Sequence, residues 1–190
     1  TNLVTSALAV NFGQRPFTHA APSGYKALNT ANLPDPTIAD GSLYFDTKLW
    51  TGNGSSGGSN QTISGYNFAP QFVWIKNRSA TEHHALFDVV RGATKLLYSS
   101  LTNAESTQSN SLISFTSDGF NVGTDGKVNG NNQSIVGWAW DAGSSTVTNT
   151  DGSISSQVRA SQTAGFSIVG YTGTGANASV GHGLNAAPSM

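Results

Sequence analysis

Apolar and polar residues alternate over short stretches of this chain, and Gly, Asn, Ser or Asp residues separate one stretch from the next. An alternation with a period of two is typical of β-strands that bury one face, and no helical period is sustained over the length of an ordinary helix. The pattern predicts strands at residues 42–50, 71–76, 85–90, 111–116, 133–140 and 165–172.

Polar turns separate these predicted strands at a spacing of roughly ten residues, which is typical of β-sandwiches. Asp118-Gly119 and Asp125-Gly126 are turn dipeptides between strands. Residues 92–97 are compatible with a single helical turn. We therefore predict an all-β fold made of β-sandwich modules, of the jelly-roll or concanavalin-like type, joined by short linkers.

Two polar segments interrupt the strand pattern. Residues 29–41 contain Pro34 and Pro36 and little apolar content, and residues 144–163 contain almost no large apolar side chain. Both compositions favour extended linkers. The glycine-rich tract 52–60 lies between two predicted strands, so we interpret it as a flexible loop inside a domain.

An internal repeat defines the modules. Residues 65–72 and 183–190 carry the same Gly, Asn, Ala and Pro at corresponding positions, and residues 50–54 match residues 171–175. A strand, a glycine-rich loop and the entry into the next strand therefore occur twice. The repeat predicts a complete β-sandwich module at residues 42–143 and the start of a second copy at residues 164–190, as expected of a piece of a longer protein.

Two parts of the chain resemble known virion proteins. Residues 10–17 and 22–28 (VNFGQRPF and PSGYKAL) resemble the last strands of a SPRY-type, concanavalin-like domain found in bacteriophage tail fibres, so residues 1–28 are expected to be the end of such a domain. Residues 69–78, 87–88, 91–93, 117–120 and 138–143 resemble a repeated module of large phage tail-fibre-like proteins. The resemblance implies a virion location and a host-recognition role, and it brings no catalytic residue.

Composition narrows the possible functions. Only 10% of the residues are charged and the net charge is −1, so the chain lacks the basic surface that nucleic-acid binding requires. The sequence contains no cysteine and no apolar run long enough to cross a bilayer. Neither nucleic-acid binding nor membrane insertion is expected, and no cofactor or metal site is assigned.

The four tryptophans are the candidate ligand-binding residues. Trp138 and Trp140 are two positions apart, so they share one face of a strand and, together with Trp50, could stack on a glycan. Large aromatic residues in a β-domain more often belong to the core, so a core position is the alternative for each tryptophan. In the strand at 71–76, Trp74 is assigned to the core, and both faces of the strand are expected to be covered.

Other chemical motifs are weak. Gly52, Gly54 and Gly57 have the spacing of a dinucleotide-binding loop, but no helical pattern follows them. The adjacent pair His83-His84 is expected to diverge on a strand, which disfavours a shared metal ion. One stretch is rich in side-chain oxygens that could bind calcium, but hairpin turns require the same residue types. The residues of this stretch are Asp118, Asp125, Asn129, Asn131 and Asn132.

The sequence therefore favours a non-enzymatic, structural part of a tail fibre that recognises a host-surface glycan and assembles as a homo-oligomer, either a trimer or a helical fibre, with other virion proteins. Two alternatives stay open. One is a polysaccharide-degrading fibre enzyme that uses a pair of carboxylates, which would come from Glu82, Asp88, Glu105, Asp118 or Asp141. The other is a non-viral extracellular filament or adhesin built from the same modules.

Overall fold

The computed structural model describes residues 18–26, 34–55 and 60–187. The chain divides into two units, Thr1–Ala39 and Asp40–Met190. In the first unit, the Tyr25 amide donates a hydrogen bond to the Pro22 carbonyl at 3.0 Å and closes a turn. Most of the predicted SPRY-like segment, at residues 1–17 and 27–28, lies outside the described residues, as do residues 29–33 of the predicted linker.

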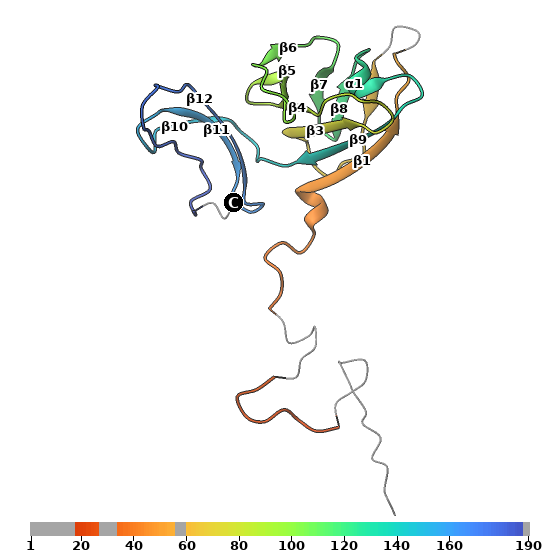
Figure 1. Ribbon diagram of the computed structural model, residues 1–190. Coiled ribbons are helices and arrows are strands. Elements are labelled where there is room, and N and C mark those ends of the chain that lie inside the picture. The colour runs from red at the N-terminus through yellow and green to blue at the C-terminus, as the bar shows by residue number, and fades with distance from the viewer. Residues whose placement is uncertain (1–17, 27–33, 56–59, 188–190) are drawn as a thin grey trace, which may run out of the picture. The chain divides into compact units, whose positions relative to one another are not determined.

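The second unit contains three antiparallel sheets (Figure 1). The largest has six strands in the order β1 (Phe45–Thr51), β9 (Ser134–Trp140), β3 (Phe72–Asn77), β4 (Ala85–Asp88), β5 (Gly92–Tyr98) and β6 (Ser106–Thr107). The second has the order β2 (Gln61–Ile63), β8 (Gly119–Val122) and β7 (Leu112–Thr116). The third has the order β10 (Val147–Asn149), β11 (Ser156–Ser161) and β12 (Phe166–Tyr171).

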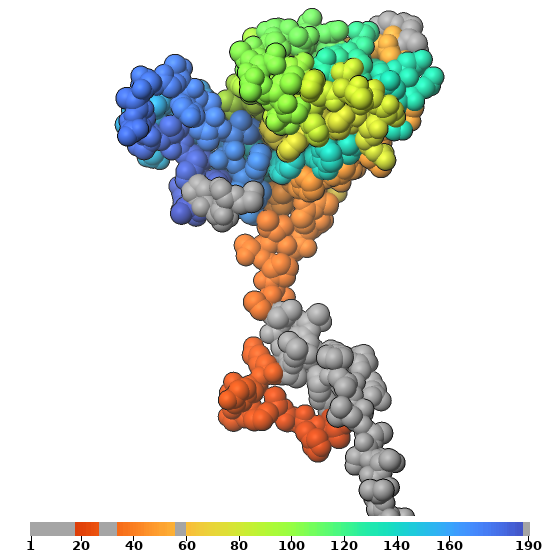
Figure 2. All heavy atoms as spheres, in the orientation of Figure 1, coloured from red at the N-terminus to blue at the C-terminus, as the bar shows by residue number. Residues whose placement is uncertain are grey.

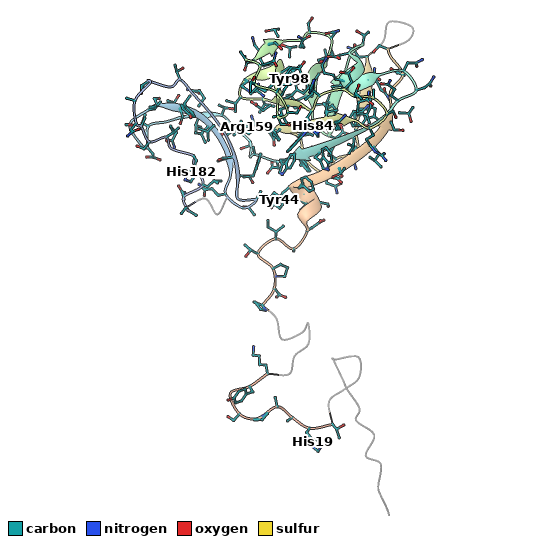
Figure 3. The ribbon with its side chains drawn as sticks, viewed as in Figure 1. His19, Tyr44, His84, Tyr98, Arg159 and His182 are labelled. Carbon is teal, nitrogen blue, oxygen red and sulfur yellow. The ribbon has the colours of Figure 1, made fainter. Side chains whose placement is uncertain are left out.

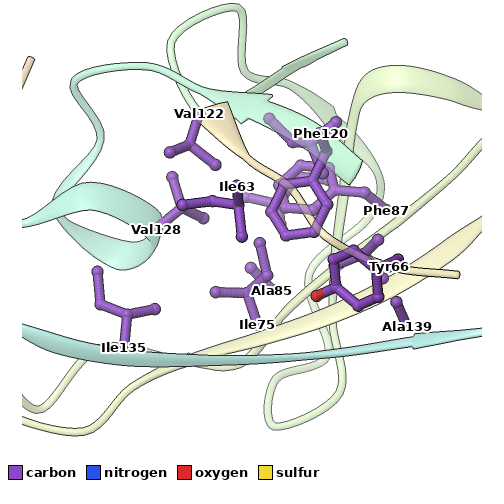
Figure 4. Packing of buried hydrophobic residues seen from close by; sticks show 13 residues of the cluster. Ile63, Tyr66, Ile75, Ala85, Phe87, Phe120, Val122, Val128, Ile135 and Ala139 are labelled. Atoms are coloured by element: carbon purple, nitrogen blue, oxygen red, sulfur yellow. The ribbon is translucent and has the colours of Figure 1, made fainter. Parts of the chain in front are cut away.

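The first two sheets enclose the hydrophobic core, so the predicted all-β sandwich is confirmed (Figure 4). Alternation along β3 shows how the sequence achieves this, because Val73 and Ile75 are fully buried between the sheets while Phe72 and Trp74 are only partly buried on the other face. The largest fully buried side chains of the core come from both sheets and the short helix: Ile75, Phe87, Leu96, Leu112, Phe120, Val122, Val128 and Ile135.

In the described part of the chain, two short helices accompany the sheets, and an aspartate caps each of them. Asp40 accepts a hydrogen bond from the Ser42 amide at the start of η2 (Gly41–Leu43). Asp125 does the same for the Lys127 amide at the start of α1 (Gly126–Asn129). The dipeptide Asp125-Gly126 therefore begins a helix rather than a hairpin turn, since an aspartate at this position satisfies an amide of the first helical turn.

The prediction of a helical turn at residues 92–97 was wrong, because these residues form β5 and pair with β4. The predicted linker at residues 144–163 was also wrong, because β10 and β11 lie within it. The buried residues of β11 are Val158 and the small residues Ser156 and Ser161. A strand that buries serine carries no large apolar side chain, which is why its sequence resembles that of a linker.

The third sheet packs against the sandwich (Figure 2). Phe166 at the start of β12 contacts Phe72 and Trp140, with ring centroids 5.9 Å apart in both pairs. Arg159 of β11 adds a polar contact, because its Nε donates to the Gly143 carbonyl at 2.9 Å. The outer face of the six-stranded sheet, which is the face turned away from the core, is therefore partly covered at the end where Trp140 lies.

The repeat has a structural counterpart in its glycines. Gly54 and the corresponding Gly175 have φ angles of 62° and 76°, and Gly65 and the corresponding Gly183 have φ angles of 89° and 72°. Left-handed backbone of this kind is accessible to glycine at little cost. The agreement is consistent with two copies, and the assignment of residues 164–190 to a second module stays a prediction.

In the described ranges, no helix combines the length and the apolar character that a membrane crossing requires.

Candidate functional site: a tryptophan pocket on the outer face of the sandwich

The outer face of the six-stranded sheet carries an aromatic cluster, because two strands place large side chains at paired positions. Trp138 and Trp140 of β9 point to the same side, as expected from their spacing. The antiparallel register sets Trp138 opposite Trp74 of β3 and Trp140 opposite Phe72. The rings of Trp74 and Trp138 meet edge to face, with centroids 6.1 Å apart and an interplanar angle of 68°.

Aromatic neighbours enclose Trp140 from three sides. Phe45 of β1 lies 4.9 Å from it, Phe72 lies 5.3 Å from it, and Phe166 of β12 lies 5.9 Å away at an interplanar angle of 21°, again measured between ring centroids. Trp138 has a different neighbour on β1, since the small residue Thr47 stands opposite it in the register. The cluster is therefore closed around Trp140 and more open around Trp138.

A pocket of about 270 Å³ lies at this open part of the cluster, and Trp74, His84, Trp138 and Trp140 line it. We call it the tryptophan pocket. His84 comes from the residue before β4, where Figure 3 labels it. Trp74 Nε1 donates a hydrogen bond to His84 Nδ1 at 2.8 Å, and the two ring centroids are 5.6 Å apart. The bond orients both rings at the edge of the pocket.

The electrostatic environment of His84 favours the neutral form of its ring. Its pKa is lowered from the usual value, first because burial disfavours the charged form, and then because Lys76 and His83 add positive charge nearby. Lys76 itself is turned to the backbone, where Nζ donates to the carbonyls of Asn77 and Ala80. Among the described residues, no carboxylate lines the pocket.

The structure brings together two of the three residues proposed from the sequence for glycan contact. Trp138 and Trp140 line the pocket, but Trp50 lies on the opposite face of the sheet. Trp50 packs against Phe120 of the core and donates from Nε1 to the Val128 carbonyl at 3.1 Å. Trp50 is therefore placed for a structural role, which corrects its selection as a possible glycan contact.

Sequence reasoning missed His84 as a pocket residue and placed Trp74 in the core. The strand at 71–76 is apolar on both faces, so alternation separates its two faces without showing which one is inside. His83 and His84 do diverge as expected, because His83 faces Tyr98 and Ser100 instead of Trp74. Only the pairing of β3 with β4 and β9 reveals that Trp74 and His84 belong beside Trp138.

Most of the residues considered for a calcium site make hydrogen bonds within the fold. Asp118 accepts a hydrogen bond from the Gly65 amide, and the amide nitrogen of the buried Asn129 donates to Asn53 and to the Gly123 carbonyl. Together with the helix cap at Asp125, these contacts occupy much of the oxygen-rich stretch. Within the described ranges, no three His, Asp or Glu side chains gather in a way that could hold a metal ion.

The glycine motif is part of the scaffold as well. The Gly52 amide donates to the Gln133 carbonyl at 2.9 Å, and the Gly54 amide donates to the Asn129 carbonyl at 3.0 Å. These amides are thus engaged with the end of α1 and the loop that precedes β9, whereas a dinucleotide-binding loop presents its amides to phosphate. Gly57, the third glycine of the motif, lies outside the described residues.

The carboxylates considered for hydrolysis also form local contacts. Asp88 and Glu105 both pair with Arg91, at nitrogen–oxygen distances of 2.6 and 3.3 Å. Asp141 accepts a hydrogen bond from the Gly143 amide at 3.1 Å. The tryptophan pocket remains the arrangement in the described structure that is best suited to bind a ligand.

Comparison with known proteins places this unit in a family. The family described as a domain of unknown function, DUF7483, matches residues 40–190, which is the range of the second structural unit. No curated protein and no solved structure matches the chain. The match covers the sandwich and the third sheet together, and on this basis the chain belongs to the DUF7483 family.

Proposed function

We propose that this chain is a structural and host-recognition part of an extracellular fibre of the phage tail-fibre type, and that it binds a neutral glycan in the tryptophan pocket. The pocket carries the proposal. Aromatic faces with few polar groups are typical of sites that hold the apolar face of a small ligand. The absence of a lining carboxylate among the described residues favours binding over cleavage.

Replacing Trp138 by alanine is expected to weaken glycan binding by roughly tenfold or more, since a central aromatic side chain usually dominates a contact surface. Isothermal titration of the whole chain with a panel of neutral oligosaccharides measures the effect. Tyr171→Ala is the matched control, because Tyr171 is an exposed aromatic residue of β12 that does not line the pocket. Equal losses in both variants, or no binding of any oligosaccharide by the wild type, would contradict the proposal.

The same titration mixtures separate a binding module from a degrading enzyme. A binding module leaves the oligosaccharides intact, whereas a glycoside hydrolase produces new reducing ends over time. An increase in reducing ends that Trp138→Ala abolishes would replace the binding proposal with the enzyme alternative.

The proposed fibre role includes assembly with further copies and with other virion proteins. β1 is one of the two edge strands of the six-stranded sheet, and it exposes Phe45 and Leu49, the latter to 66%. An edge strand offers unpaired backbone groups to a second strand. We expect light scattering to give the mass of a homo-oligomer for the full chain and a smaller mass for Leu49→Lys. A monomeric wild type would contradict oligomeric assembly and leave glycan binding as a separate question.

A further inference from the structure

The hydrogen bond between Trp74 and His84 fixes the chemistry of the His84 ring. An indole nitrogen only donates, so His84 Nδ1 is the acceptor and carries no proton. In the neutral imidazole the proton then belongs to Nε2, which is a hydrogen-bond donor. His84 therefore contributes one donor to the pocket, and its one acceptor is already used by Trp74.

The other described residues that line the pocket also offer hydrogen-bond donors and no free acceptor. The three indole nitrogens are donors, and the one of Trp74 is engaged with His84. Among the described lining residues, no side chain offers a free acceptor. A ligand group that fits this pocket accepts hydrogen bonds, presents apolar surface to the indole rings, and does not need to donate.

The charges around the pocket and its volume further limit the class of ligand that it can bind. The charges that lower the pKa of His84 come from Lys76 and His83, and both groups can contribute only positive charge, so they disfavour a cationic ligand such as a quaternary ammonium group. The volume of about 270 Å³ is smaller than the roughly 300–1,000 Å³ of sites for drug-sized ligands. A single small substituent with one sugar ring suits this space.

We propose that the tryptophan pocket binds the acetamido group of an N-acetylhexosamine. The methyl group packs against the indole rings of Trp74 and Trp138, and the carbonyl oxygen accepts a hydrogen bond from His84 Nε2. This inference rests on the proposed glycan-binding function and specifies the class of sugar. The acetamido group combines an acceptor with an apolar end and carries no charge, and its single N–H donor, for which the described lining residues offer no acceptor, is left to solvent at the open side of the pocket.

Three trisaccharides with the same backbone linkage test the inference on the whole wild-type chain. N,N′,N″-triacetylchitotriose carries acetamido groups, cellotriose carries hydroxyl groups at the same positions, and the glucosamine trimer carries ammonium groups. Triacetylchitotriose is expected to bind roughly tenfold or more tightly than cellotriose, since it supplies both the methyl contact and the acceptor. Saturation-transfer NMR is expected to give its largest signals at the acetyl methyl protons.

The variant His84→Phe keeps an aromatic ring but removes the Nε2 donor, so we expect it to lower the affinity for triacetylchitotriose several-fold. The affinity stays above that for cellotriose, because the methyl contact with the indole rings of Trp74 and Trp138 remains. His83→Phe is the matched control, because the adjacent His83 faces Tyr98 on the other side and is expected to leave both affinities unchanged. Thermal unfolding of each variant shows whether it remains folded, and the comparison of wild-type affinities does not depend on any variant.

The outcomes separate this inference from the function on which it rests. Equal binding of triacetylchitotriose and cellotriose overturns the acetamido assignment and leaves glycan binding in place. Tighter binding of the glucosamine trimer also overturns the assignment, in favour of a cation against the indole rings. If none of the three binds while another neutral oligosaccharide does, only the acetamido assignment fails. If no carbohydrate binds at all, both proposals fail.

Discussion

Replacing Ile75 by alanine is expected to lower the free energy of unfolding by about 2–5 kcal/mol. Ile75 is fully buried and belongs to the core between the two sheets of the sandwich. Alanine removes three carbon atoms from a close-packed site, so both the lost hydrophobic transfer and the cavity left behind destabilise the protein. Urea denaturation followed by circular dichroism measures the change.

Trp74 is the informative comparison, because it is adjacent in β3 and larger but lies on the outer face. Trp74→Ala removes an aromatic contact with Trp138 and a hydrogen bond to His84, which together contribute about 1–2 kcal/mol. We therefore expect the smaller side chain to produce the larger loss. A larger loss for Trp74→Ala than for Ile75→Ala would contradict the assignment of the two faces of β3.

These two neighbouring positions show what the sequence determines. Alternation located the strand and separated Phe72 and Trp74 from Val73 and Ile75, because successive side chains of a strand point to opposite faces. It did not show which face lies inside, because both faces carry large apolar side chains. That information comes from the second sheet, which covers Val73 and Ile75, and from Phe166, which covers part of the other face.

The site could be predicted only in part for a related reason. Trp138 and Trp140 share a strand, so their common face follows from spacing alone. Trp74 and His84 join them through the pairing of β3 with β9 and with β4, and this register depends on contacts between residues far apart in the sequence. Residue type alone does not show the face, because Trp50 is a tryptophan like Trp138 but lies on the core side of the sheet, where it contacts Phe120.

The strand β11 was missed because the structure buries small polar residues there. Ser156 is almost completely buried, and its hydroxyl donates to the Gly181 carbonyl at 3.2 Å. A buried polar group that is hydrogen-bonded is compatible with a packed strand. Hydrophobic alternation cannot detect such a strand, since the pattern depends on apolar side chains.

The glycine-rich repeat leads to a second stability prediction. Gly52→Ala is expected to lower the free energy of unfolding by about 3 kcal/mol, as an overpacked site does when its neighbours cannot move away. A Cβ atom at Gly52 would lie 2.2 Å from the carbonyl oxygen of Gly130 and 2.8 Å from the carbonyl carbon of Asn129. These backbone atoms belong to the end of α1 and to the loop that follows it, and Gly52 is hydrogen-bonded to that loop through the Gln133 carbonyl and the Asn132 amide.

The repeat itself supplies the control for this prediction. Gly173 corresponds to Gly52 in the second copy, but a Cβ atom there would meet nothing within 4 Å. Gly173→Ala is therefore expected to change the free energy of unfolding by no more than about 0.5 kcal/mol. Urea denaturation of both variants distinguishes close backbone packing, which is present only at Gly52, from a need for glycine shared by both copies. Similar losses in the two variants would show that backbone freedom, and not the contact with Gly130, is what requires glycine at these positions.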